Sequence, residues 1–221
     1  MLKQAWAIFR KDLASELRTR YAVNALLMFV VVTLAVIMFS LVGETLTPGA
    51  LTGMLWVVMF FAAMSGLSRS FVAEEERGTT MTLQLLATPA AVYLGKLLFN
   101  LLLVLVLNVF IVALYVLVME QFSIRQPDLF WLVMLLGSLC MASATTIIAA
   151  IIAKANTRGT LFPVLSFPVL LPLLMAGISA TKIAVEEGRW ASAWPDLQLL
   201  GSYLVVVTTV AFLLFDFVWR D

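Results

Sequence analysis

Six long apolar stretches constrain this chain more than any other feature of its sequence. The hydrocarbon core of a bilayer is about 30 Å thick, and an α-helix needs about 20 apolar residues to cross it. Apolar runs of this length predict helices, which satisfy their own backbone hydrogen bonds inside lipid. The sequence therefore predicts an all-α polytopic membrane protein with one transmembrane domain over residues 1–221. The six predicted spans are 22–42, 50–68, 97–119, 129–153, 160–180 and 197–218.

Composition excludes a soluble domain and several kinds of chemistry. Apolar residues make up 63% of the chain and charged residues 12%, and a soluble domain of this length cannot bury so much apolar surface. The chain has no histidine, and its one cysteine, Cys140, lies inside an apolar run. Neither a histidine-ligated metal nor a disulfide framework is therefore expected. No phosphate-binding loop and no nucleophile with a neighbouring base is present, which predicts a chain that is not an enzyme and binds no cofactor directly.

The basic residues of the short loops predict the orientation. Cytoplasmic loops carry the excess of Lys and Arg, and eleven of these residues fall on one side of the predicted bundle against three on the other. Both termini are therefore expected in the cytoplasm. The cytoplasmic set is Lys3, Arg10, Lys11, Arg18, Arg20, Arg69, Arg77, Lys96, Lys154, Arg158 and Arg220, and the external set is Arg125, Lys182 and Arg189.

Residues 1–21 are too polar to span a membrane but are amphipathic. Their apolar side chains recur at helical spacing, which predicts a helix along the cytoplasmic membrane surface. A simple membrane anchor and an anchor with a further role both fit this pattern. The predicted apolar face is Leu2, Trp6, Phe9, Leu13 and Leu17.

Residues 69–96 form the longest predicted cytoplasmic loop. Its acidic run is expected to extend the second span as a helix that ends at Gly78, and a short second helix is expected to end at Pro89. This short helix fits a rigid peg that transmits a push from a soluble partner, and it fits a solvated loop equally well. The acidic turn and its flank are Glu74, Glu75, Glu76, Arg77 and Gly78.

Three further features bear on packing and on the membrane interface. Pro163, Pro168 and Pro172 break the backbone pattern of the fifth span and predict a kink, either static or part of a moving element. Trp190 and Trp194 are one helical turn apart in the last external segment and are typical of interfacial anchors, with a partner surface as the alternative. Asn108 is expected to bond to another helix, and the small residues of the fourth span predict close packing.

Two segments carry extended sequence patterns. Residues 71–96 carry the pattern Phe-x-x-Glu-x-x-x-Gly-Thr followed by Leu-x-Leu-Leu-x-x-Pro-x-x-Val-x-x-Gly-Lys. Residues 158–174 carry Arg-Gly-x-Leu and then Leu-x-x-Pro-x-x-x-Pro-Leu-Leu. Both segments resemble the haem exporter B family. The length and the six-span layout also match, while Glu74, Asn100 and residues 101–104 depart from the family pattern.

The resemblance implies an ABC-2-type permease-like subunit in cytochrome c maturation at the bacterial inner membrane. It implies a separate cytoplasmic ATPase that binds ATP, and partners that hold haem: a haem-handling membrane subunit and a periplasmic haem chaperone. ATP hydrolysis would drive haem export or release of the loaded chaperone, with two copies of this chain per complex. The expected ATPase contacts are the acidic turn 74–78 and a second cytoplasmic turn with Lys154 and Arg158.

Two other functions fit the same residues. The architecture is shared by exporters of a lipid, a drug or a polysaccharide. A non-transporting scaffold also fits, since no charged residue lies at mid-depth in any predicted span.

Overall fold

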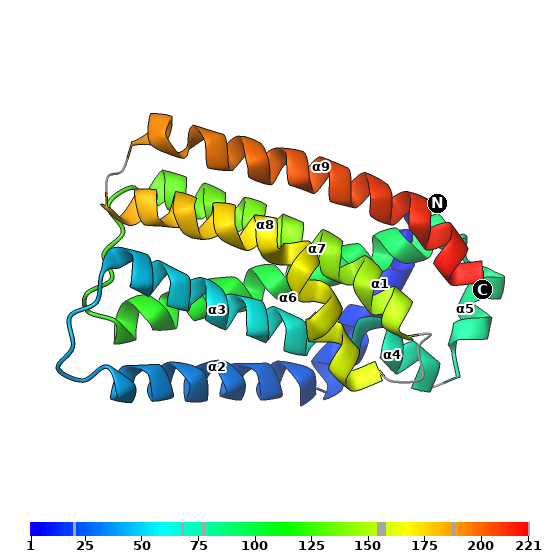
Figure 1. The fold of residues 1–221 in the computed structure, drawn as a ribbon. Helices are drawn as coiled ribbons and strands as arrows, with labels where there is room; N and C mark the ends of the chain where they lie inside the picture. The colour runs from blue at the N-terminus through cyan, green and yellow to red at the C-terminus, as the bar shows by residue number, and fades with distance from the viewer. Residues whose placement is uncertain (20, 68, 77, 154–157, 187–188, 221) are drawn as a thin grey trace.

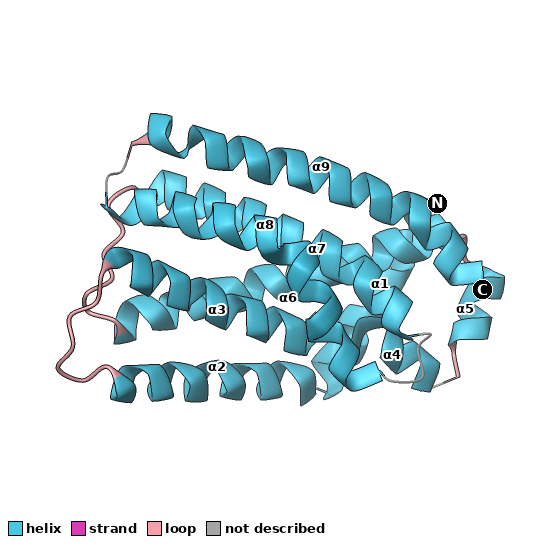
Figure 2. Ribbon diagram, viewed as in Figure 1, coloured by secondary structure: helices cyan, strands magenta, loops and turns pink. Residues whose placement is uncertain are grey.

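The fold is entirely helical over the described part of the chain, as the apolar stretches predict. The computed structural model describes all residues except 20, 68, 77, 154–157, 187–188 and 221, and no β-strand occurs among the described residues (Figure 2). The helices are α1 (Leu2–Thr19), α2 (Tyr21–Ser40), α3 (Pro48–Leu67), α4 (Arg69–Glu76), α5 (Thr80–Leu86), α6 (Pro89–Val118), α7 (Pro127–Ala153), α8 (Arg158–Glu186) and α9 (Trp190–Arg220).

Six of these helices are long and apolar enough to cross a membrane, so the protein is a multi-pass membrane protein. They are α2, α3, α6, α7, α8 and α9, and they run side by side as one bundle (Figure 1). Both chain termini lie at the same end of the bundle, together with α1, α4 and α5. We call this end the termini end.

Several helices extend beyond the apolar stretches from which they were predicted. α6 begins at Pro89, well before the predicted start at 97, and α9 begins at Trp190. The expectation that Pro89 ends the short loop helix is wrong: α5 ends at Leu86, and Pro89 occupies the first turn of α6. Proline has no N–H and a helix-compatible φ, so the first helical turn is the position where it fits best.

α7 forms the centre of the bundle, and 19 of its 27 residues are buried. It contacts α6, α8 and α9. Its small residues let the neighbouring backbones approach closely, which confirms the packing expected for the fourth span. The buried small residues of α7 are Gly137, Ser138, Ala142, Ser143, Ala144, Ala149, Ala150 and Ala153.

Trp56 of α3 fills the space between α7 and α8. Its side chain is fully buried, and its Nε1–H donates a hydrogen bond to Thr181 Oγ1 at 2.9 Å. The indole ring lies directly against Gly137 and Gly177, where any added Cβ would overlap with it. The two glycines therefore make room for a fully buried tryptophan side chain.

Polar side chains also join the spans. Asn108 donates to Ser138 Oγ at 2.9 Å, which confirms the predicted bond to another helix, and Asn100 donates to Thr146 Oγ1 at 2.8 Å. Both bonds connect α6 to α7. Hydrogen bonds of this kind contribute only about 0.6 to 2 kcal/mol each inside a membrane. They therefore orient the two helices about their axes more than they stabilise the fold.

α8 changes direction in its first half (Figure 1). Pro168 and Pro172 lie in this helix with exposed side chains, and the side chain of Pro163 lies outside the described set. Between Pro168 and Pro172, the hydroxyl of Tyr203 in α9 donates to the carbonyl of Val169 at 2.8 Å. This bond ties the proline segment to α9.

Candidate functional site

The N-terminal helix α1 crosses the termini end of the bundle at a steep angle to α2 (Figure 1). It packs against α6 through Ala5 and Ile8, which are 2% and 5% exposed. At the contact, Gly95 of α6 lies so close that an added Cβ would be 2.8 Å from the carbonyl oxygen of Ala5 and from Cβ of Ile8. Small residues on both helices therefore allow backbone-to-backbone contact.

The face of α1 that docks on the bundle differs from the apolar face predicted from sequence. Leu2, Trp6 and Leu17 are exposed, and Trp6 stacks on Phe9 with ring centroids 5.0 Å apart. The helix carries a bulky apolar stripe and a second stripe of smaller residues, and the smaller one docks because only it permits close approach to Gly95. The bulky stripe remains available to lipid.

Gly95→Ala is expected to destabilise the folded chain by about 1 to 3 kcal/mol, because the atoms that the new methyl group meets belong to the α1 backbone and to a branched side chain. The fraction folded should be followed in detergent against increasing denaturant. Gly201→Ala in α9 is the matched control, since its Cβ would meet nothing within 4 Å. Equal midpoints for the two variants would contradict the close contact.

α4 and α5 form a short helical hairpin at the same end. Gly78 joins them with φ +65°, a left-handed conformation that glycine adopts without strain, and the N–H of Thr79 donates to the carbonyl of Glu74 at 3.0 Å. The Thr79 hydroxyl donates to Glu74 Oε2 at 2.5 Å. The turn thus holds the Glu74 carboxylate against its own backbone.

Four charged side chains from three helices meet between this hairpin and α1. We call Lys11, Asp12, Glu74 and Lys96 the charge cluster. Lys96 of α6 is 2% exposed and lies 2.9 Å from Asp12 Oδ2, 2.9 Å from Glu74 Oε1 and 2.9 Å from the carbonyl of Ser70. Lys11 pairs with Glu74 and lies 3.2 Å from Asp12. The cluster holds two cations and two carboxylates and is electrically balanced.

Lys11 is the member of the charge cluster nearest to solvent, with a side chain that is 46% exposed. Partial burial acts to lower its pKa, but the hydrogen bond to Glu74 and the negative charge of Asp12 outweigh burial, so the pKa lies above its ordinary value. Lys11 therefore carries its charge at neutral pH.

The predicted acidic turn divides into different environments. Glu74 is buried in the charge cluster, Glu75 accepts a hydrogen bond from the Thr80 hydroxyl at 2.8 Å, and Glu76 is exposed. Arg77 and Lys154 lie outside the described residues. Arg158 is the first residue of α8, and its side chain is not among those described.

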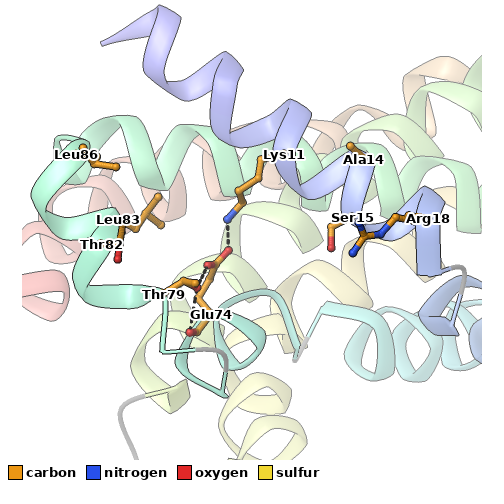
Figure 3. A pocket seen from close by; sticks show the side chains of 9 residues that line it. All are labelled: Lys11, Ala14, Ser15, Arg18, Glu74, Thr79, Thr82, Leu83 and Leu86. Atoms are coloured by element: carbon orange, nitrogen blue, oxygen red, sulfur yellow. Dashed lines mark hydrogen bonds and ion pairs between the residues drawn. The ribbon is translucent and has the colours of Figure 1, made fainter.

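A groove of about 510 Å³ opens beside the charge cluster (Figure 3). One wall is α1 and the other is the α4–α5 hairpin. Lys11 reaches across the groove to Glu74 in Figure 3, while Arg18 and Ser15 line it farther along α1. The lining residues are Lys11, Ala14, Ser15, Arg18, Glu74, Thr79, Thr82, Leu83 and Leu86.

α5 presents an apolar face that no described part of the chain covers. Met81, Leu85 and Leu86 are 73%, 82% and 71% exposed, and α5 has no buried residue. Its position is fixed nevertheless, because Gln84 donates to the carbonyl of Trp219 in α9 at 2.6 Å and Gln4 donates to the carbonyl of Leu86 at 3.3 Å. Hydrogen bonds therefore fix the position of the hairpin, while α5 at its tip remains exposed.

The opposite end of the bundle is simpler. Trp190 and Trp194 are 42% and 58% exposed in the first turns of α9. The guanidinium of Arg125 donates to the carbonyl of Glu186 at 2.9 Å, at the end of α8, where a cation also complements the helix dipole. Among the described residues, no group of three or more His, Cys, Asp or Glu side chains is placed to hold a metal ion.

Sequence reasoning missed two members of the charge cluster. Asp12 was not singled out, and Lys96 was named only as a cytoplasmic cation and as the last residue of the family motif. A signal for Asp12 was present, because it follows Ala5 and Ile8 at helical spacing on the docking stripe of α1. No local pattern reveals that Lys96 is buried.

A comparison with protein-family models shows which family the chain belongs to. The family described as CcmB protein matches residues 3–217, essentially the whole chain, and this is the haem exporter B family that the sequence motifs resemble. Comparison with curated proteins returns no match. The chain belongs to the CcmB protein family and is therefore a membrane subunit of the haem exporter of cytochrome c maturation.

Proposed function

We propose that this chain couples ATP hydrolysis by a separate ATPase subunit to haem export or to release of the haem-loaded periplasmic chaperone. Membership of the CcmB family makes the chain part of an ABC-type haem exporter with partner subunits. The inner membrane location, cytoplasmic termini and two copies of this chain per complex belong to the proposal. ATP and haem are held by the partners.

The exposed apolar face of α5 carries this proposal. The face lies at the termini end, which the excess of Lys and Arg assigns to the cytoplasm. An apolar helix tip in water is typical of a surface that a partner covers. The exposed Glu76 and the partly buried Glu75 border this tip, so they provide an acidic rim for basic residues of the ATPase. Lys154 and Arg158 remain the proposed second contact.

Glu74 has a different role in this proposal from that of its two neighbours. Its carboxylate is occupied by Lys11, Lys96 and Thr79 and is 7% exposed. It is therefore proposed to hold the hairpin in place and not to touch the ATPase. Gly78 provides the turn that points α5 outward.

Haem is proposed to bind elsewhere in the complex. The chain has no histidine, and the thiol of Cys140 is buried and donates to the carbonyl of Leu200 at 3.4 Å. The exposed Trp190 and Trp194 lie at the end that would face the periplasm, and they are proposed as interfacial anchors beside the haem-handling subunit.

The double substitution Met81→Glu and Leu85→Glu tests the docking surface. We expect co-purification of the ATPase subunit in mild detergent to fall at least tenfold, because two charges would be buried against an apolar partner surface. Thr82→Glu, an exposed position on the same helix that faces the groove, is the matched control and should retain binding within about twofold. Unchanged co-purification in the double variant, with normal amounts in the membrane, would refute the docking surface.

A further inference from the structure

We propose that the charge cluster holds α1, α4 and α6 together as one rigid body. A displacement of α5 is then transmitted in full to the spans α2 and α6. Lys11, Asp12, Glu74 and Lys96 are in this view positioning residues that transmit motion and touch neither ATP nor haem. That α5 is displaced by a partner rests on the proposed function, whereas the rigidity of the three helices is a property of this chain alone.

The surroundings of Lys96 show how the three helices are joined. Its ammonium group has three N–H donors, and three oxygens lie 2.9 Å away: one from Asp12 in α1, and two from α4, the Glu74 carboxylate and the Ser70 carbonyl. The ring of Phe71, also in α4, lies 5.6 Å from the same nitrogen. This buried cation is thus hydrogen-bonded to α4, through Glu74 and the Ser70 carbonyl, and ion-paired with Asp12 of α1.

Such an arrangement fixes the relative positions of the three helices more than it stabilises the fold. Buried ion pairs are often no more stabilising than apolar residues of the same volume, because removing the charges from water offsets their attraction. Charge-assisted hydrogen bonds are, however, short and directional, and sliding any one of the three helices would break two of the ion pairs of the cluster. The cluster therefore resists relative movement of α1, α4 and α6 more than apolar packing would.

The rigid body is hydrogen-bonded both to the exposed hairpin tip and to the first span. On the hairpin side, Glu74 bonds to Thr79, directly before α5. On the span side, the Glu16 carboxylate of α1 accepts a hydrogen bond from the backbone N–H of Val23 at 3.1 Å, in the first turn of α2. A carboxylate at a helix N-terminus also complements the helix dipole. α1 is thus bonded at one point to the cluster and at another to α2.

The double substitution Glu74→Gln and Lys96→Met is the direct test. It removes one carboxylate and one cation, so the remaining Lys11 and Asp12 stay balanced and the chain should still fold. We expect amide hydrogen exchange in residues 80–86 to rise at least tenfold in the complete complex. The amount of mature cytochrome c should fall at least tenfold, while the ATPase co-purifies within about twofold of wild type. Glu44→Gln, an exposed position in the loop between α2 and α3, is the control and should change none of these.

Each outcome decides a separate question. Normal exchange, or normal cytochrome c maturation with rapid exchange, overturns the rigid coupling. Failure of the wild-type chain to co-purify an ATPase refutes the proposed function, and the exchange result still decides on the rigid body. If the double variant does not accumulate in the membrane, Thr79→Val replaces it. This variant removes one exposed hydroxyl donor to Glu74 and should raise exchange in residues 80–86 about threefold, and unchanged exchange would again overturn the proposal.

Discussion

Replacing Lys96 alone by methionine is expected to lower the free energy of unfolding by about 3 to 5 kcal/mol. The substitution leaves Asp12 and Glu74 buried with only the half-exposed Lys11 between them, and an uncompensated buried charge is the costly result of breaking such a pair. The measurement is the denaturant midpoint of the purified chain in detergent, supported by its amount in the membrane.

Lys182→Met is the matched control for this prediction. Lys182 pairs with Glu186 one turn away at 3.7 Å, and its side chain is 48% exposed. Exposed pairs of this kind contribute about 0 to 1 kcal/mol, so the control should remain close to wild type. In addition, the double variant Glu74→Gln with Lys96→Met should be more stable than Lys96→Met alone, because it restores the charge balance. If Lys96→Met is as stable as Lys182→Met, the prediction is wrong and the buried cluster is wrongly described.

Trp56→Ala is expected to destabilise the bundle by about 3 kcal/mol. Apolar side chains gain little by leaving lipid for the protein interior, so the loss comes from packing and from the hydrogen bond to Thr181. The indole is 0% exposed and rests on Gly137 and Gly177, whose backbones cannot close the space that its removal leaves. Unfolding in detergent measures the effect.

A variant of the acceptor separates packing from the hydrogen bond. Thr181→Val keeps the indole against Gly137 and Gly177 and removes the hydroxyl that accepts the indole N–H, so it should cost about 1 to 2 kcal/mol. If Trp56→Ala and Thr181→Val are equally destabilising, the packing of α3 against α7 and α8 contributes little and the prediction fails.

The fold class followed from the sequence because the bilayer reduces the choice of structure to apolar helices of a minimum length. The six spans were therefore visible as six uninterrupted apolar runs. The ends of the helices were not visible, because polar residues at the ends of the bundle are compatible with a helix. α6 begins at Pro89 and α9 begins at Trp190, and both residues lie outside the apolar runs.

Only part of the arrangement at the termini end could be read from the sequence. The motif around Glu74 lies in the loop that carries the hairpin, and Gly78 was expected at the turn where its positive φ now appears. The pattern contained three successive glutamates, and nothing local distinguishes Glu74, which points inward, from the exposed Glu76. That distinction depends on Asp12 and Lys96, which reach Glu74 only after α1 and α6 have packed together.

The same long-range pairing has a consequence for how the protein is made. Asp12 is synthesised early, but its buried partner Lys96 follows only after α2 and α3 are complete. During biosynthesis α1 therefore waits at the membrane surface, with its exposed Leu2, Trp6 and Leu17 as the residues that hold it there. Its final docking is possible only once the start of α6 has emerged from the ribosome, so the first helix of the chain reaches its native place after the two spans that follow it have been made.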